Sequence, residues 1–192
     1  MLFRAYFVCL IEKGSTQSPF ASEPAEVAAG RRPGDDHRMT ATIVLTVPVS
    51  APAAATWAGA VDWDGQGEWM LGTRVAGTAQ GGIGVGGGIE AFTGVGRLGF
   101  VDTMVITRWE PPQRCHVLHT GRLVRGTGAF EVQERGVDRS VFVWREDLEL
   151  PLGALGRLGW PLVRPLFTAG VRLSLRRFAR WVEAGRPAAR AA

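Results

Sequence analysis

The chain contains 192 residues, of which 46% are hydrophobic and 21% are charged. This balance is typical of a single globular domain, and no apolar run approaches the roughly 20 residues of a membrane span, so we expect no transmembrane helix. All but one of its 22 basic residues are arginine, and they exceed the 18 acidic residues by four. So small an excess, in a composition typical of a GC-rich bacterial genome, predicts no nucleic-acid partner. Two cysteines cannot form a disulfide framework, which favours a reducing, cytoplasmic location.

The first 38 residues differ in composition from the rest. A short apolar run at residues 5–11 is followed by a segment, 14–38, that is rich in Ser, Pro, Gly, Ala and charge. Such a segment buries too little apolar surface to offset the entropy cost of ordering. Met39 opens a run that is typical of a protein start. We therefore expect residues 1–38 to be disordered or mis-assigned, 39–185 to form the domain, and 186–192 to be a disordered tail.

The next segments alternate between strand and helix patterns. Dense β-branched residues predict a strand at 40–48, and two short helices are expected at 53–63 and 64–70. Six candidate strands follow, separated by Gly- or Pro-containing turns, at 73–78, 89–93, 100–109, 115–124, 129–134 and 140–150. Such short connections favour antiparallel neighbours. The order predicts an α+β fold, with helices on one face of an antiparallel sheet.

A long helix is expected at residues 166–184, after two prolines. Its apolar stripe at three- or four-residue spacing consists of Phe167, Val171, Leu175, Phe178 and Val182. Arg172, Arg176 and Arg180 share another face of the helix. That face could meet an acidic partner or anionic lipid headgroups, although arginines placed for solubility explain it more simply.

Two glycine-rich segments match the spacing of a dinucleotide-binding loop, at residues 82–87 and 94–99. Such a loop requires a strand before it and a helix N-terminus after it. Both matches precede strand patterns instead. They are therefore interpreted as hairpin turns and bulges, and we expect no cofactor.

Cys115, His116 and His119 are close enough in sequence to suggest a metal site. In a strand, however, positions 116 and 119 point to opposite faces, so the two imidazoles cannot reach one ion without a bulge. Cys115 and His119 share a face, but two ligands alone make a poor metal site. We therefore expect no metal. His119 is interpreted either as an ordinary, partly exposed histidine or as a side chain that points into a cavity.

Strand alternation at residues 140–150 places Phe142, Trp144 and Glu146 on one face and Arg145 on the other. The aromatic face is the better candidate for the interior, where Glu146 would have a raised pKa and could act as an acid or base. A cross-strand ion pair with an arginine is the simpler role for this carboxylate. No recognisable nucleophile or phosphate-binding motif accompanies it.

Several short motifs resemble those of the SRPBCC superfamily, which includes START lipid-transfer domains, birch-pollen allergens and polyketide cyclase/dehydrase-like proteins. They include the entry from the first strand to a Thr-Trp pair, the aspartate-to-tryptophan helix pair, the turn after a central strand and the approach to the last helix. These stand at residues 46–57, 61–69, 107–112 and 150–156. The resemblance spans about residues 40–185.

The resemblance implies a helix-grip fold, in which a seven-stranded antiparallel sheet wraps around the long C-terminal helix, with two short helices after strand 1. It also implies a hydrophobic cavity between sheet and helices, which would bind a lipid, polyketide or aromatic molecule. By alternation and this analogy, the ligand-binding candidates are Trp69, Phe92, His119, Phe130, Phe142, Trp144, Glu146, Phe167 and Val171. Core packing is the alternative role for the aromatic residues among them.

Three functions therefore remain open. The first is a carrier or binding protein for a hydrophobic small molecule, as a monomer or homodimer. The second is a cyclase or dehydratase acting on a polyketide, with His119 or Glu146 moving protons and Arg122 or Arg145 supplying charge. The third is an interaction module that uses the arginine face of the last helix.

Overall fold

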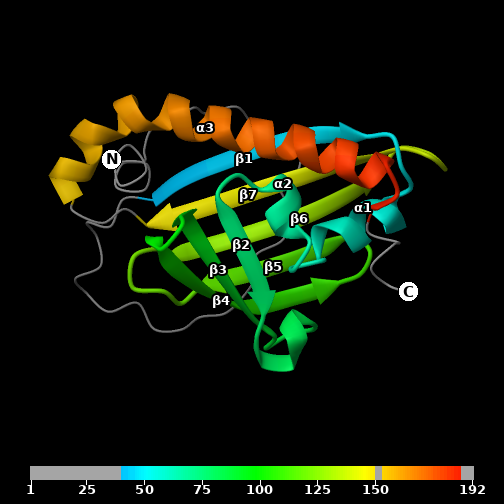
Figure 1. Cartoon of the computed structure of the whole chain (residues 1–192), viewed down its shortest axis with the longest axis horizontal. Helices are drawn as coiled ribbons and strands as arrows, with labels where there is room; N and C mark the ends of the chain where they lie inside the picture. Colours follow the sequence, from blue (N-terminus) through cyan, green and yellow to red (C-terminus); the bar gives the residue numbers. More distant parts are fainter. Residues whose placement is uncertain (1–39, 150–152, 187–192) are drawn as a thin grey trace.

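The computed structural model describes residues 40–149 and 153–186. Its elements alternate as expected, with two short helices near the start and one long helix at the end (Figure 1). The helices are α1 (Ala53–Ala60), α2 (Gln66–Trp69) and α3 (Gly153–Glu183), and a 3₁₀ turn covers Ala79–Gly82. The strands are β1 (Thr40–Val49), β2 (Thr73–Gly77), β3 (Gly88–Val95), β4 (Leu98–Glu110), β5 (Arg114–His119), β6 (Gly126–Glu134) and β7 (Ser140–Glu149).

The seven strands form one sheet in the order β1-β7-β6-β5-β4-β3-β2, and every neighbouring pair is antiparallel. β1 and β2 are the two edge strands. The sheet curls, and α3 runs along its concave side close to β1 (Figure 1). The predicted α+β helix-grip fold is therefore confirmed.

The second glycine motif is the tight β3–β4 hairpin, as predicted. Gly94 and Gly99 are directly opposite each other, and Gly96 in the turn has a φ of 59°, which a residue with a Cβ rarely adopts. A Cβ on Gly94 would lie 2.3 Å from the carbonyl oxygen of Leu98. These glycines therefore allow the chain to reverse direction between β3 and β4.

The last helix is longer than predicted. We expected it to begin at residue 166, after Pro161 and Pro165, but it begins at Gly153. A proline inside a helix removes one backbone hydrogen bond and bends the axis, but it need not end a helix that other contacts hold in place. Figure 1 shows the first turns of α3 bending away from the axis of the rest. The predicted end holds, because Gly185 follows Glu183 with a φ of 70°.

The core lies between the sheet, α1, α2 and the C-terminal half of α3. Phe178 of α3 and Phe142 of β7 are both fully buried, and their ring centroids are 4.6 Å apart. The ring centroid of Trp69 in α2 lies 4.9 Å from that of Phe178. Two hydrogen bonds add to this packing, from the Leu71 amide to Ser174 Oγ and from Trp181 Nε1 to Glu68 Oε2. Contacts made by the tryptophan and phenylalanine rings thus hold the helices against the sheet.

Candidate functional site

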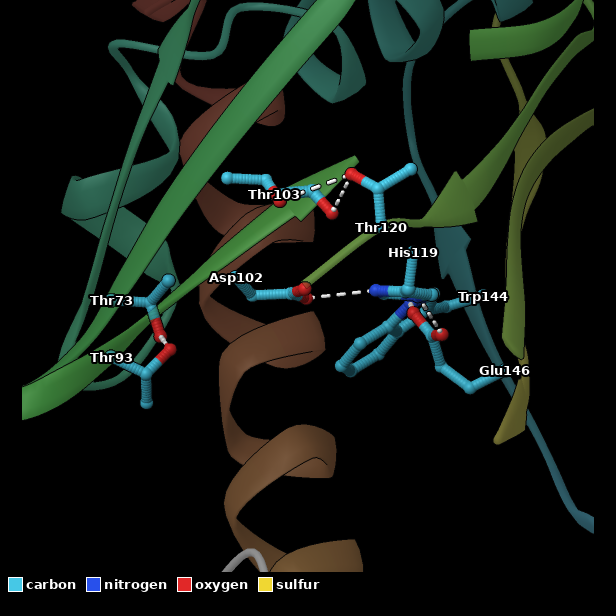
Figure 2. Close-up of polar contacts among 8 residues, drawn as sticks. All are labelled: Thr73, Thr93, Asp102, Thr103, His119, Thr120, Trp144 and Glu146. Carbon is cyan, nitrogen blue, oxygen red and sulfur yellow. Dashed lines mark hydrogen bonds and ion pairs between the residues drawn. The ribbon is translucent and has the colours of Figure 1, made fainter. Parts of the chain in front are cut away.

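Three ionisable side chains meet on the concave face of the sheet. His119 ends β5, Asp102 lies in β4 and Glu146 lies in β7. Asp102 Oδ2 is 2.8 Å from His119 Nδ1, and Glu146 Oε2 is 3.0 Å from His119 Nε2. Figure 2 shows the two carboxylates on opposite sides of the imidazole ring. We call these three residues the triad.

The strand order explains how Glu146 reaches His119. β6 lies between β7 and β5, and the β6 residue opposite Glu146 is Gly128. A Cβ at Gly128 would lie 3.1 and 3.2 Å from the two Glu146 carboxylate oxygens and 3.0 Å from Val117 Cγ2. The missing side chain therefore leaves the space through which the carboxylate crosses β6. Trp144 Nε1 donates a 2.7 Å hydrogen bond to Glu146 Oε1 and orients the carboxylate.

The triad is almost entirely removed from solvent. The side chains of His119, Asp102 and Glu146 are 5%, 10% and 13% exposed, respectively. Burial lowers the pKa of the His119 imidazole, but hydrogen bonds and charge from Asp102 and Glu146 outweigh burial and raise that pKa to about 10. At neutral pH the ring is therefore an imidazolium that donates through both nitrogens.

One carboxylate oxygen of the triad has no hydrogen-bond partner among the described residues. This atom is Asp102 Oδ1, and it is buried. It faces Gly121, where a Cβ would lie only 3.1 Å away. The other three carboxylate oxygens of the triad each have a hydrogen-bond partner, so Asp102 Oδ1 is the one that no described protein group contacts by a hydrogen bond.

Apolar side chains surround the triad on the same face. Met104 is directly opposite His119 in the β4–β5 ladder, and Val117 precedes His119 by two residues. The partly buried hydrophobic side chains that pack against the core include Met104, Val117, Phe130, Trp144 and Phe167. The surroundings of the triad thus combine apolar surface with a few polar groups, which is typical of small-molecule sites.

The structure brings some of the predicted site residues together and separates others. His119, Glu146 and Trp144 form one hydrogen-bonded group. Trp69 and Phe142, in contrast, are buried in the core against Phe178, as is Val171 in the same cluster. These three side chains belong to the packed core.

Three predicted residues lie away from the triad. Phe92 lies on the convex face beneath Arg74, whose guanidinium carbon is 5.0 Å from the ring centroid. Arg145 also faces outward and forms a 2.6 Å ion pair with Asp147. Arg122 is exposed in the β5–β6 turn. Phe92 and Arg145 face away because successive strand residues alternate between the faces of a sheet.

The alternation argument against a metal site agrees with the positions of the side chains. Cys115 is buried on the concave face, and burial raises the pKa of its thiol to about 12. His116 faces the convex side, where its Nε2 lies 3.9 Å from a Glu131 oxygen. His116 and His119 therefore belong to different environments.

Sequence reasoning missed Asp102 and Gly128. The predicted strand at 100–109 contained a usable signal, because Asp102 shares a face with the apolar residues Met104 and Ile106. An acid in an inward-facing apolar row requires a partner. For Gly128 no local signal exists, because its importance depends on Glu146 in the next strand.

A groove of about 740 Å³ lies elsewhere, between β1 and α3. Its lining combines five consecutive β1 residues with one face of the helix, including the predicted arginine face. The residues are Val44, Leu45, Thr46, Val47, Pro48, Arg172, Leu175, Arg176, Ala179 and Arg180. We call it the edge groove. It is separate from the triad, which lies on β4, β5 and β7.

Replacing Gly128 by alanine should destabilise the protein by about 1–3 kcal/mol, because the new methyl group overlaps Val117 and the hydrogen-bonded Glu146 carboxylate. Urea unfolding measures the change. Gly170→Ala in α3 is the control, since a Cβ there meets nothing within 4 Å and should stabilise the helix by about 0.5–1 kcal/mol. A Gly128→Ala protein as stable as the wild type would contradict the inference that the Glu146 carboxylate needs the space beside Gly128 to reach His119.

Comparisons with known proteins agree with this architecture. Residues 40–183 match a family described as polyketide cyclase/dehydrase and lipid transport. No curated protein matches the chain. Within the described helices, none has the length and hydropathy of a membrane span.

Several solved structures share the fold at low sequence identity. The Zhui aromatase/cyclase from Streptomyces sp. R1128 is 16% identical, with a TM-score of 0.61 over 76% of this chain and 94% of that chain. A Thermus thermophilus protein, TTHA0849, is also 16% identical, with a TM-score of 0.64 over 76% and 99% of the two chains. Norcoclaurine synthase from Thalictrum flavum, in complex with dopamine and hydroxybenzaldehyde, is 14% identical, with a TM-score of 0.56 over 87% and 96%.

Proposed function

Because the chain belongs to the family described as polyketide cyclase/dehydrase and lipid transport, we propose that it binds an apolar, carbonyl-bearing small molecule on its concave face and transfers protons on it. The binding part rests on the apolar side chains around the triad. The reaction class is the cyclisation or dehydration of a polyketide-like chain. Both reactions need a proton removed from a carbon next to a carbonyl.

The observation that carries the proposal is the imidazole held between two carboxylates. Buried ion pairs rarely stabilise a protein more than apolar side chains of similar volume, because each charge is desolvated. Pure storage of an apolar ligand would not require these charges. A buried acid–base group beside apolar surface is, in contrast, what proton transfer in a water-poor site requires.

The three side chains have different roles in this proposal. Asp102 is the base, because its Oδ1 is the unpaired oxygen. The His119 imidazolium holds the two carboxylates in place and offsets their charge. Glu146 accepts hydrogen bonds from His119 and Trp144 and passes the His119 proton to the leaving oxygen, after which His119 recovers a proton from Asp102.

A dehydration assay tests the proposal. The probe is the aryl β-hydroxyketone formed from benzaldehyde and acetone, which loses water to give benzylideneacetone, followed by its ultraviolet absorbance. Base removal of the α-proton and protonation of the departing hydroxyl should make the wild type faster than buffer. His119→Gln and Asp102→Asn should each slow the reaction at least about 100-fold, the lower range for losing a general acid or base.

The matched control is His116→Gln, which changes the neighbouring histidine on the convex face and should retain the wild-type rate. Equal rates for the wild type and His119→Gln would refute proton transfer by the triad. Native mass spectrometry of the same full-length protein distinguishes an enzyme from a carrier. An apolar molecule that co-purifies, together with no dehydration, would instead support a carrier.

A further inference from the structure

The edge groove contains an exposed strand edge that no other strand covers among the described residues. β1 pairs with β7 along one side only, from Thr40 to Val49. The groove lies along β1 and is lined by five consecutive residues, so its wall includes both faces and the backbone edge of this strand. An edge strand of this kind presents unpaired N–H and C=O groups to which an extended peptide can bind.

The opposite wall of the groove is positively charged. Arg172, Arg176 and Arg180 line it, and all three are exposed. No ion pair joins any of them to a carboxylate of the described residues. The floor between the wall and β1 is apolar, and includes the buried Leu175 and Ala179. Three unpaired cations above an apolar floor are complementary to an acidic, partly apolar ligand.

The spacing of the arginines also fits an extended chain. Four residues of α-helix rise about 6 Å, so the helix positions of the three arginines repeat at about that interval. Alternate residues of a β-strand point to the same side and repeat every 6.6–6.8 Å, roughly the same distance. Over the three arginines the mismatch is only about 1–2 Å, which long arginine side chains can absorb.

We infer that the edge groove binds an extended acidic segment of a partner protein, which adds to β1 as an eighth strand. Its acidic residues stand at every second position and face Arg172, Arg176 and Arg180. The residues between them face outward beside Val44, which is 50% exposed, and favour β-branched side chains. Pro48 lacks a backbone N–H and limits the pairing at that end of the groove. This interaction uses no atom of the triad.

Peptide binding to the full-length protein tests the inference. The probe is a fluorescein-labelled heptapeptide, Thr-Glu-Val-Glu-Val-Glu-Thr, followed by fluorescence anisotropy. Changing Arg172, Arg176 and Arg180 together to glutamine should weaken its binding at least 10-fold. The control variant changes Arg97, Arg125 and Arg139 to glutamine, which removes the same charge elsewhere and should alter the affinity less than twofold.

Two further probes separate strand addition from simple charge attraction. A scrambled peptide with its three glutamates adjacent has the same charge but the wrong spacing, and should bind at least 10-fold more weakly. Two N-methylated peptides, each blocking the amides along one edge, should differ, because only one edge can pair with β1. Equal binding by all these peptides would overturn the inference.

Anionic vesicles of phosphatidylglycerol and phosphatidylcholine provide the remaining test. If the arginine face binds peptide, the vesicles should compete weakly and the triple variant should change vesicle binding little. Vesicles that displace the peptide fully, and lose affinity in the Arg172, Arg176 and Arg180 variant, would overturn the peptide inference in favour of a membrane surface.

Discussion

Raising the pH from 6.5 to 8.5 should lower the free energy of unfolding by about 2 kcal/mol in total, with a slope that approaches about 1.4 kcal/mol per pH unit, because His119 keeps its proton only in the folded protein. Its folded pKa is raised from 6.5 to about 10 by Asp102 and Glu146. A group with a raised folded pKa contributes its full stability below the unfolded pKa. That contribution is lost as the pH rises through the folded pKa, so the dependent window is about 6.5 to 10.

Urea unfolding at half-unit pH intervals measures this slope. His119→Gln removes the titrating group and should make stability nearly independent of pH between 6.5 and 8.5. The wild type should be measured below pH 9, because burial also raises the pKa of Cys115 and adds a second loss of stability at higher pH. A Cys115→Ala protein separates the two effects. Equal slopes for the wild type and His119→Gln would show that folding does not raise the pKa of His119.

Replacing Phe178 by alanine should cost about 3–5 kcal/mol of stability, the range for deleting a fully buried phenylalanine. Phe178 contacts Trp69 and Phe142 at centroid distances of 4.9 and 4.6 Å. Its removal therefore opens a cavity where α3, α2 and β7 meet. The surrounding rings come from different elements and cannot all collapse into the space.

The control is Leu173→Ala on the same helix. Leu173 is 40% exposed, and leucine and alanine have similar helix propensities, so stability should change by less than about 1 kcal/mol. Thermal and urea unfolding of both variants give the comparison. Comparable losses for the two substitutions would mean that the aromatic contacts do not hold α3 on the sheet.

The fold was largely predictable because its signals are local. β-branched residues and Gly- or Pro-containing turns marked strands near all seven observed positions, and the three- and four-residue spacing of Val171, Leu175, Phe178 and Val182 marked the inward stripe of α3. The start of α3 was wrong because proline was read as a helix boundary. Whether a helix continues through a proline depends on the contacts of its other residues, which local sequence does not show.

The site was only half predictable. Alternation correctly placed Glu146 on the face of Phe142 and Trp144, and His119 on the face of Cys115. It could not show that these two faces meet across Gly128, nor that Asp102 of β4 completes the triad. Residues 1–38 were predicted to be disordered or mis-assigned, and they lie outside the described residues, as does most of the predicted tail at 186–192.

The sequence by itself therefore determined the order of strands and helices, the inward faces of β7 and α3, and two members of the triad. Only the tertiary structure decided which inward residues touch. It joined Asp102 to His119, packed Trp69 and Phe142 into the core, and placed the arginine face beside β1, an edge strand of the described sheet. The physical reason is that periodicity depends on neighbours in sequence, whereas contacts between strands depend on sheet order and register.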